Sequence, residues 1–383
     1  MFGTHFRIAG VVALAATLWA GTAGAQEYTA RIGHLESPQQ ARHQGLQMVA
    51  DLVKERTDGA VEFTIYPAGQ LGQAREMNEG VQLGVIEGTV SPAAFLAGFN
   101  PAVSILDVPF LYPADRETAS ELRSGAFGES VLESFEPLGF KAIAIWPNGR
   151  KSCTSNKAMD DVAAFGGQRC RVMDSKVLMA QFDAVGASAV PLPFGELYTA
   201  LQTGVVDGQE NALDTIATMK YNEVQKNLLV SGHGANEDVV LFNPAWWNSL
   251  PEKYQTVIVE AFEEVRPKVE AIKEASQDKA LKTLKDAGMN VRELTDEERQ
   301  TMREQMYPKA REAYLAQAGD AATKRAADHP HADLAVRIGH FGFNLGKCRV
   351  ARAWMHCQQP GAGLHRAVQR QRRQDLDLSF GIE

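Results

Sequence analysis

One long amphipathic stretch limits the possible folds of this chain more than any other feature. From Glu252 to about Asp286, apolar side chains recur at helical spacing and form a single stripe. The stripe consists of Val257, Ile258, Ala261, Phe262, Val265, Val269 and Ile272. At a rise of about 1.5 Å per residue, such a helix approaches about 50 Å, which is longer than one small domain. We therefore expect it to lie across two domains and to kink at Pro267.

Strand and helix patterns alternate through residues 26–328, which predicts an α/β fold with mostly parallel pairing. Capping boxes at Ser37 to Gln40 and at Thr295 to Glu298 predict two helix starts. Strands are expected near 28–34, 61–66, 88–91, 140–146, 151–155, 168–172, 187–190 and 239–242. Further helices are expected near 77–83, 175–185, 195–203 and 211–220. A length of 383 residues is enough for two lobes, each with its own core.

The first 25 residues resemble a secretory signal peptide. His5 and Arg7 precede an apolar run over residues 8–20, and Ala23-Gly24-Ala25 is typical of a cleavage site. The alternative is an N-terminal membrane anchor, but this run falls short of the roughly 20 residues that span a bilayer. We therefore expect residues 1–25 to be removed and the mature protein to be exported to the periplasm.

Residues 329–383 differ in composition from the rest of the chain. They hold five of the nine His and two of the four Cys, and their basic residues outnumber their acidic ones. Two interpretations are possible. The segment is either a native basic tail that contacts a membrane or an acidic partner, or a disordered, non-native extension. The second interpretation predicts that this tail is dispensable for folding and binding.

Known catalytic motifs are absent from the sequence. It contains no G-x-S-x-G, H-E-x-x-H or phosphate-loop pattern, and His34, His43 and His233 are the only histidines between the leader and the tail. A net charge of −8 argues against a nucleic-acid binder that relies on positive charge. An exported two-lobed chain of this kind favours a binding protein with a cleft between its lobes, and no metal or cofactor is expected.

Two segments carry a resemblance to a known family. They are Arg169-Cys-Arg-Val-Met-Asp174 and the block from Pro193 to Asn211, which ends in Val-Asp-Gly-Gln-Glu-Asn. Both are similar to segments of the solute-binding receptors of TRAP (tripartite ATP-independent periplasmic) transporters of the C4-dicarboxylate type. Shorter matches at 66–72, 82–87, 107–111 and 250–255 extend the resemblance from about residue 28 to about residue 317.

The resemblance implies a monomeric receptor with two α/β lobes, joined by crossing strands and a long kinked helix. Such a receptor closes on a small organic acid and delivers it to membrane permease subunits, without a cofactor. The implied lobe boundaries are 26–148 plus about 237–276 for lobe I, and 149–236 plus about 277–328 for lobe II. Two alternatives are a periplasmic ligand sensor and an enzyme acting on an organic acid.

The resemblance also implies ligand-binding residues. Arg171 matches the family's signature arginine, whose planar guanidinium can hold a carboxylate through two hydrogen bonds. A second cation is expected after Asn148-Gly149, where gap-free alignment selects Lys151 and the residue type favours Arg150.

Three further positions match pocket residues of the family. The Asn211 amide can donate and accept hydrogen bonds, and Phe194 is either a pocket aromatic or a core residue. Asp174 would suit a ligand with hydroxyl or amino groups, or it faces solvent. Ser91 and Pro92 stand where sugar-acid receptors carry an acidic residue, which argues against a ligand like sialic acid.

Cys153 and Cys170 are a candidate disulfide, because an oxidising compartment favours pairing. Strand alternation complicates this, since Cys170 points away from Arg171 while Cys153 shares a face with Lys151. Bulged strands, a cleft position for Arg150 and unpaired cysteines therefore all stay open.

Overall fold

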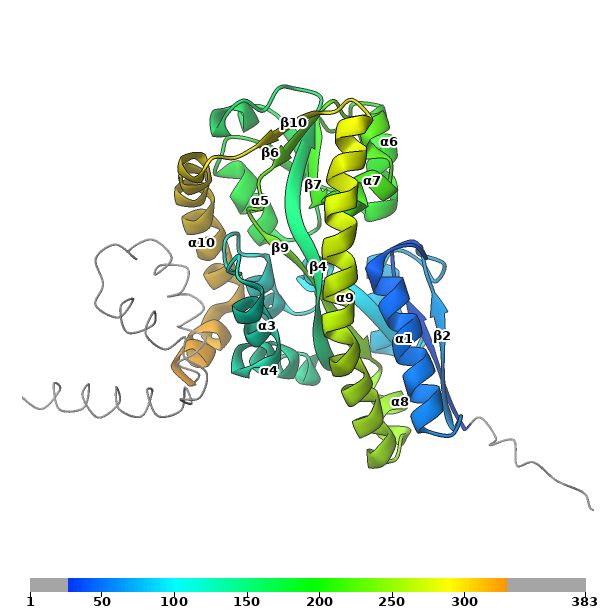
Figure 1. Cartoon of the computed structure of the whole chain (residues 1–383). Helices are drawn as coiled ribbons and strands as arrows, with labels where there is room; N and C mark the ends of the chain where they lie inside the picture. Colours follow the sequence, from blue (N-terminus) through cyan, green and yellow to red (C-terminus); the bar gives the residue numbers. More distant parts are fainter. Residues whose placement is uncertain (1–26, 329–383) are drawn as a thin grey trace, which may run out of the picture.

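The computed structural model describes residues 27–328, and side chains are described as far as residue 318. The chain forms two α/β lobes that lie one above the other in Figure 1. The expected leader and tail lie outside the described residues. Within residues 27–328, no helix is both long and apolar enough to cross a membrane.

Lobe I is built on a sheet with the strand order β2-β1-β3-β9-β4. Strand β1 is parallel to both of its neighbours, β2 and β3, whereas the pairs β3–β9 and β9–β4 are antiparallel. Its own strands and helices are β1 (Tyr28–Gly33), α1 (Ala41–Arg56), β2 (Val61–Tyr66), α2 (Ala74–Leu83), β3 (Gly88–Pro92), α3 (Arg116–Ser124), α4 (Ala126–Glu133) and α8 (Pro244–Ser249).

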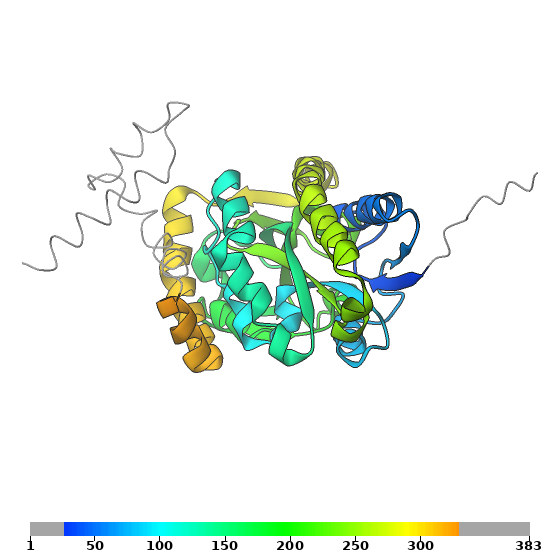
Figure 2. The same cartoon turned by 90° about the horizontal axis from the view of Figure 1, so that it is seen from below.

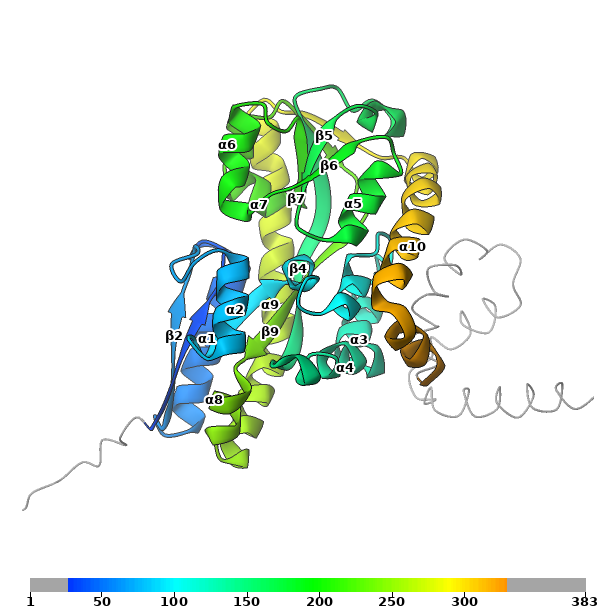
Figure 3. The ribbon, with the colours of Figure 1, turned by 180° about the vertical axis from the view of Figure 1, so that it is seen from behind.

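Lobe II is built on a second run of strands in the order β4-β7-β5-β6, with β8 on the other edge of β4 and β10 beside β8. Helices α5 and α10 lie on one side of β5–β7, and α6 and α7 on the other (Figure 3). Its strands and helices are β5 (Arg169–Val172), α5 (Lys176–Asp183), β6 (Ser188–Pro191), α6 (Leu197–Gln202), β7 (Gly208–Ala212), α7 (Leu213–Thr218), β8 (Asn227–Val230), β10 (Asn290–Glu293) and α10 (Asp296–Asp328).

Three elements carry the chain from one lobe to the other: the strands β4 (Lys141–Ser155) and β9 (Ala235–Phe242) and the helix α9 (Glu252–Asp286). Helix α10 also packs in both lobes, with Met302 in the lobe II core and Ala310 in the lobe I core. Strand β4 pairs with β9 in lobe I and with β7 and β8 in lobe II. Its register shifts between Pro147 and Arg150, where Gly149 adopts φ 86°. This positive φ favours glycine, and a Cβ at Gly149 would also lie only 3.1 Å from the Ala212 Cβ where β4 passes α9.

Helix α9 contacts the cores of both lobes, as its length predicted. Its first half packs beside α1 (Figure 2), and Trp146 donates a 3.2 Å hydrogen bond from Nε1 to the Phe262 carbonyl. Its second half places Ala280 and Leu284 in the core formed with α6 and α7. The helix continues through Pro267, which leaves the carbonyl of Glu263 without its usual amide donor.

Several local predictions are wrong in detail. The pairing is mixed rather than mostly parallel, because β4 and β9 cross the lobes antiparallel to their neighbours. The strands expected at 140–146 and 151–155 are one strand, and residues 208–212, partly assigned to a helix, form β7. At the first capping box the helix begins only at Ala41, whereas the box between Thr295 and Glu298 is confirmed.

Candidate functional site

Arg171 and Asn211 share one face of the lobe II sheet. On β5, Cys170 and Val172 pack against α5 and α10, so Arg171 between them points to the other face. Arg171 is paired in register with Gln209 of β7, and Asn211 lies two residues further along that strand. The structure therefore brings the two principal predicted ligand residues to the same side of the sheet.

The Arg171 guanidinium is buried without a carboxylate. Its side chain is 1% exposed, and Nε and Nη2 donate to the Leu192 carbonyl at 3.0 and 2.8 Å. Among the residues whose side chains are described, it forms no ion pair. Burial lowers its pKa to about 10, because a charged guanidinium is poorly solvated there. A buried cation in this state is suited to an anion that comes from outside the protein.

The surroundings of Arg171 come from both lobes. Its guanidinium carbon lies 6.0 Å from the ring centre of Phe95, which follows β3 in lobe I. Phe194, two residues after the carbonyl that Arg171 contacts, packs against the lobe I core while staying partly exposed. The next residue, Gly195, donates its amide to the Gln73 side chain of lobe I at 3.3 Å. Arg171 and Phe194 thus lie where the lobes meet.

Asn211 belongs to a hydrogen-bonded row of side chains on the same face as Arg171. Its amide donates to the Gln209 side chain at 2.5 Å, and Gln209 donates to the Thr154 hydroxyl at 3.0 Å. At 8% exposed it is buried at the edge of this row. The row fixes the Asn211 side chain while its carbonyl oxygen stays available.

Lys151 lies on the opposite face of the sheet and is already paired. It faces Ala212 in register, and its ammonium forms a 2.8 Å ion pair with Glu210. Burial penalises the Glu210 charge, but Lys151 and the donors around Glu210 hold its pKa at about 2. A ligand at Lys151 would have to compete with that carboxylate, and its assignment as the second cation stays a prediction.

Arg150, one residue earlier, is partly buried and contacts lobe I. It donates to the carbonyl of Tyr112 at 3.4 Å and to that of Pro113. Burial lowers the pKa of Arg150, and within the described side chains it forms no ion pair. Asp174 is exposed, in agreement with its solvent-facing alternative.

The expected disulfide is not formed: Cys153 and Cys170 are both buried and free. The physical reason is strand order, because β7 lies between β4 and β5. Cys153 faces Glu210 and Cys170 faces Gly208, so two strand spacings of about 4.8 Å separate their backbones. That distance exceeds the roughly 7 Å limit for a bridge.

A chain of hydrogen bonds from Ser231 through His233 to Glu210 was not expected from the sequence. Ser231 Oγ lies 2.6 Å from His233 Nδ1, and His233 Nε2 lies 2.7 Å from Glu210 Oε2. The order resembles a hydrolase triad, but Ser231 and His233 have no exposed surface and Glu210 also neutralises Lys151. The chain therefore satisfies buried polar groups on the face of the sheet opposite Arg171.

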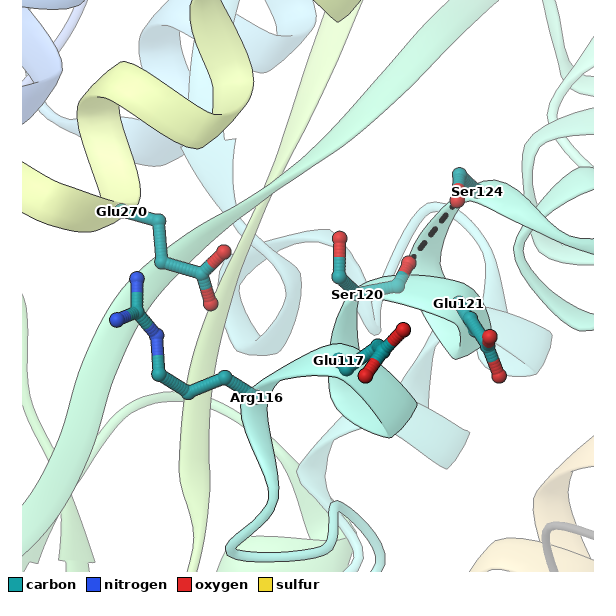
Figure 4. Close-up of a pocket in the computed structure, with 6 residues that line it drawn as sticks. All are labelled: Arg116, Glu117, Ser120, Glu121, Ser124 and Glu270. Carbon is teal, nitrogen blue, oxygen red and sulfur yellow. Dashed lines mark hydrogen bonds between the residues drawn. The ribbon is translucent and has the colours of Figure 1, made fainter. Parts of the chain in front are cut away.

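One surface hollow lies away from these residues. Arg116, Glu117, Ser120, Glu121 and Ser124 of α3 line it together with Glu270 of α9 (Figure 4). Its carboxylates outnumber its guanidinium, and Arg116 is already paired with Glu274 at 2.5 Å. An organic anion would be repelled there, so this hollow is not the candidate site.

The fold and the buried, unpaired Arg171 between two lobes define a solute-binding receptor. The sequence profile of the bacterial extracellular solute-binding proteins, family 7, matches residues 32–317, and the chain belongs to that family. Its relatives include TRAP receptors, and the chain is a transport receptor of this type.

Three relatives illustrate the similarity. A TRAP periplasmic solute-binding protein from Desulfovibrio salexigens, solved with bound orotic acid, is 61% identical with a TM-score of 0.79, covering 81% of this chain and 99% of that one. One from Sulfurospirillum deleyianum with bound succinate is 29% identical with a TM-score of 0.72, covering 79% and 99%. The C4-dicarboxylate-binding periplasmic protein DctP of Rhodobacter capsulatus is 34% identical over 289 residues, or 74% of this chain and 86% of its own.

Proposed function

We propose that this receptor captures a small organic acid between its lobes, with one carboxylate of the ligand held by Arg171. The observation that carries the proposal is the buried guanidinium that has no carboxylate partner in the described part of the chain. Asn211 and the ring of Phe194 complete the binding surface from lobe II, and the ring of Phe95 faces them from lobe I. Bound ligand then stabilises contact between the lobes.

Orotate is the first ligand to test. A receptor that is 61% identical holds orotic acid, whereas one that is 29% identical holds succinate. A flat ring with a single carboxylate suits one unpaired guanidinium with the phenyl ring of Phe95 beside it. A C4-dicarboxylate is the second candidate, since Arg150 also lacks an ion pair among the described side chains and would supply the other cation.

We also infer the partners of the receptor and its place of action. The receptor works in the periplasm after removal of residues 1–25, as a monomer without a cofactor or catalytic residues, and transfers its ligand to TRAP permease subunits. The lobe boundaries at 148/149 and near 236 and 276 are part of this proposal, with the register shift of β4 at Gly149 as support for the first.

Titration calorimetry with orotate and with succinate tests the proposal. Arg171→Ala removes the guanidinium and should weaken binding by about 2–5 kcal/mol, because the ligand carboxylate is left without its partner. Arg169→Ala is the matched control, since Arg169 lies on the same strand but is exposed and paired with Asp207 at 3.1 Å. An unchanged dissociation constant in Arg171→Ala would remove the basis of the assignment.

A further inference from the structure

A buried group of charges joins the two lobes at the middle of α9. The Lys273 ammonium lies 3.3 Å from a Glu36 oxygen and 2.7 Å from an Asp214 oxygen. Glu36 belongs to the loop between β1 and α1 in lobe I, and Asp214 to the first turn of α7 in lobe II. All three side chains are at most 5% exposed.

Each carboxylate stands on an element of its own lobe, and a second polar contact joins the lobes beside them. Glu36 accepts the Arg42 amide at 3.2 Å and lies 3.8 Å from the Arg42 guanidinium, which itself pairs with Asp238 of β9. Asp214 stands on α7, next to Thr215, whose hydroxyl accepts a 3.3 Å hydrogen bond from the Gln40 amide of lobe I. A rotation of one lobe against the other would therefore separate Glu36 from Asp214.

Lys273 lies where α9 changes from one core to the other. Val269, one turn earlier, packs in lobe I, and Ala280, two turns later, packs in lobe II. Burial penalises the charged groups, yet Lys273 and Arg42 hold the pKa of Glu36 at about 2. The other Asp214 oxygen is buried without a hydrogen-bond partner. The charges are satisfied in this arrangement only while both carboxylates contact the ammonium.

We propose that Lys273 is a positioning residue that holds the lobes together by sharing its ammonium between Glu36 of lobe I and Asp214 of lobe II. The ion pairs favour the closed arrangement, in which Phe95 and Gln73 of lobe I contact lobe II as in this structure, before any ligand arrives. Ligand affinity rises as a result, because less of the binding free energy is spent on closure. The affinity part of this inference rests on the proposed function, whereas the closure of the ligand-free receptor does not.

The test measures the distance between the lobes in the ligand-free protein. Spin labels at Arg75→Cys on α2 and Lys220→Cys beyond α7 occupy side chains that are 78% and 70% exposed, one on each lobe. Lys273→Met keeps the length of the side chain and removes its charge. Lys282→Met is the matched control, since Lys282 lies on the same helix, is 77% exposed and pairs only with the nearby Asp286.

The inference predicts that Lys273→Met shifts the ligand-free distance distribution to longer values and that Lys282→Met does not. Glu36→Gln, which keeps the shape of the side chain, should produce the same shift and supplies a second route if Lys273→Met folds poorly. The dissociation constant for orotate should rise about tenfold in Lys273→Met, as a smaller closed fraction requires.

Unchanged distances in both Lys273→Met and Glu36→Gln would overturn the inference, even if the melting temperature fell, because the charges would then be purely structural. If the unsubstituted receptor binds neither orotate nor succinate, the proposed ligand class fails while the distance measurement still decides the role of Lys273.

Discussion

Arg171 and Lys151 are both cations on the sheet of lobe II, and both are 1% exposed. They lie on opposite faces of the sheet and differ in the kind of group that they contact. Lys151 is neutralised by Glu210, whereas the Arg171 guanidinium hydrogen-bonds only to a backbone carbonyl among the described residues. Burial alone therefore does not identify a ligand site in this receptor. The distinguishing property is a buried charge that no described carboxylate neutralises.

We expect the largest effect on stability on the face of the lobe II sheet that carries the Lys151–Glu210 ion pair, which we call the paired face. Lys151→Met leaves the Glu210 carboxylate buried without its cation, and we expect a loss of about 3–5 kcal/mol in the free energy of unfolding. Urea denaturation measures it, and the double variant Lys151→Met/Glu210→Gln should recover most of the loss. A stability close to that of the unsubstituted protein in Lys151→Met would show that the pair is not what holds this face together.

On the other face, ligand affinity should depend more on the planar geometry of the Arg171 guanidinium than on its charge alone. Arg171→Lys keeps a positive charge but loses the planar fork, so orotate affinity should fall nearly as far as in Arg171→Ala. Calorimetry on both variants separates the two effects. Full binding by Arg171→Lys would mean that a point charge is enough, and the contrast with Lys151 would then rest on pairing alone.

Acid should lower the stability that the Lys151–Glu210 pair contributes. The pKa of Glu210 lies near 2 in the folded protein, below its ordinary value of 4.5. Its stabilising contribution is therefore complete above about pH 4.5 and is lost as the pH falls towards 2. Glu210→Gln should show a smaller decrease in unfolding free energy over this window in urea titrations. Equal decreases in the two proteins would contradict the assigned pKa.

The smallest expected effect concerns the cysteines on the Lys151 face. Because Cys153 and Cys170 are free and two strands apart, a reducing agent should leave the melting temperature unchanged. Intact-mass measurement after alkylation of the unfolded protein, on a chain truncated after Asp328, should show both thiols modified. A mass two hydrogens lower and without label would reveal a bridge.

Local sequence patterns were enough to predict the helices whose formation depends mainly on residues close in sequence. The ends of α9 follow from its apolar stripe, and the Thr295 capping box marks the start of α10. Patterns of this kind failed at 147–149, where Pro147 and Gly149 resemble a break but β4 continues through a register shift.

Long-range order explains the other differences. The motif Gly-Gln-Glu-Asn-Ala lacks β-branched residues and does not look like a strand, yet pairing on both sides makes it β7. Its position between β4 and β5 separates the cysteines and assigns Glu210 and Asn211 to opposite faces. The contact of Lys273 with both lobes likewise depends on packing that no local pattern contains.

The most direct test of the account is a crystal structure of the receptor with its ligand. The account predicts a ligand carboxylate within hydrogen-bond distance of the Arg171 guanidinium, with the Lys151–Glu210 pair intact on the other face of the sheet. A ligand carboxylate on Lys151, with Glu210 displaced and Arg171 still bound only to the Leu192 carbonyl, would contradict it.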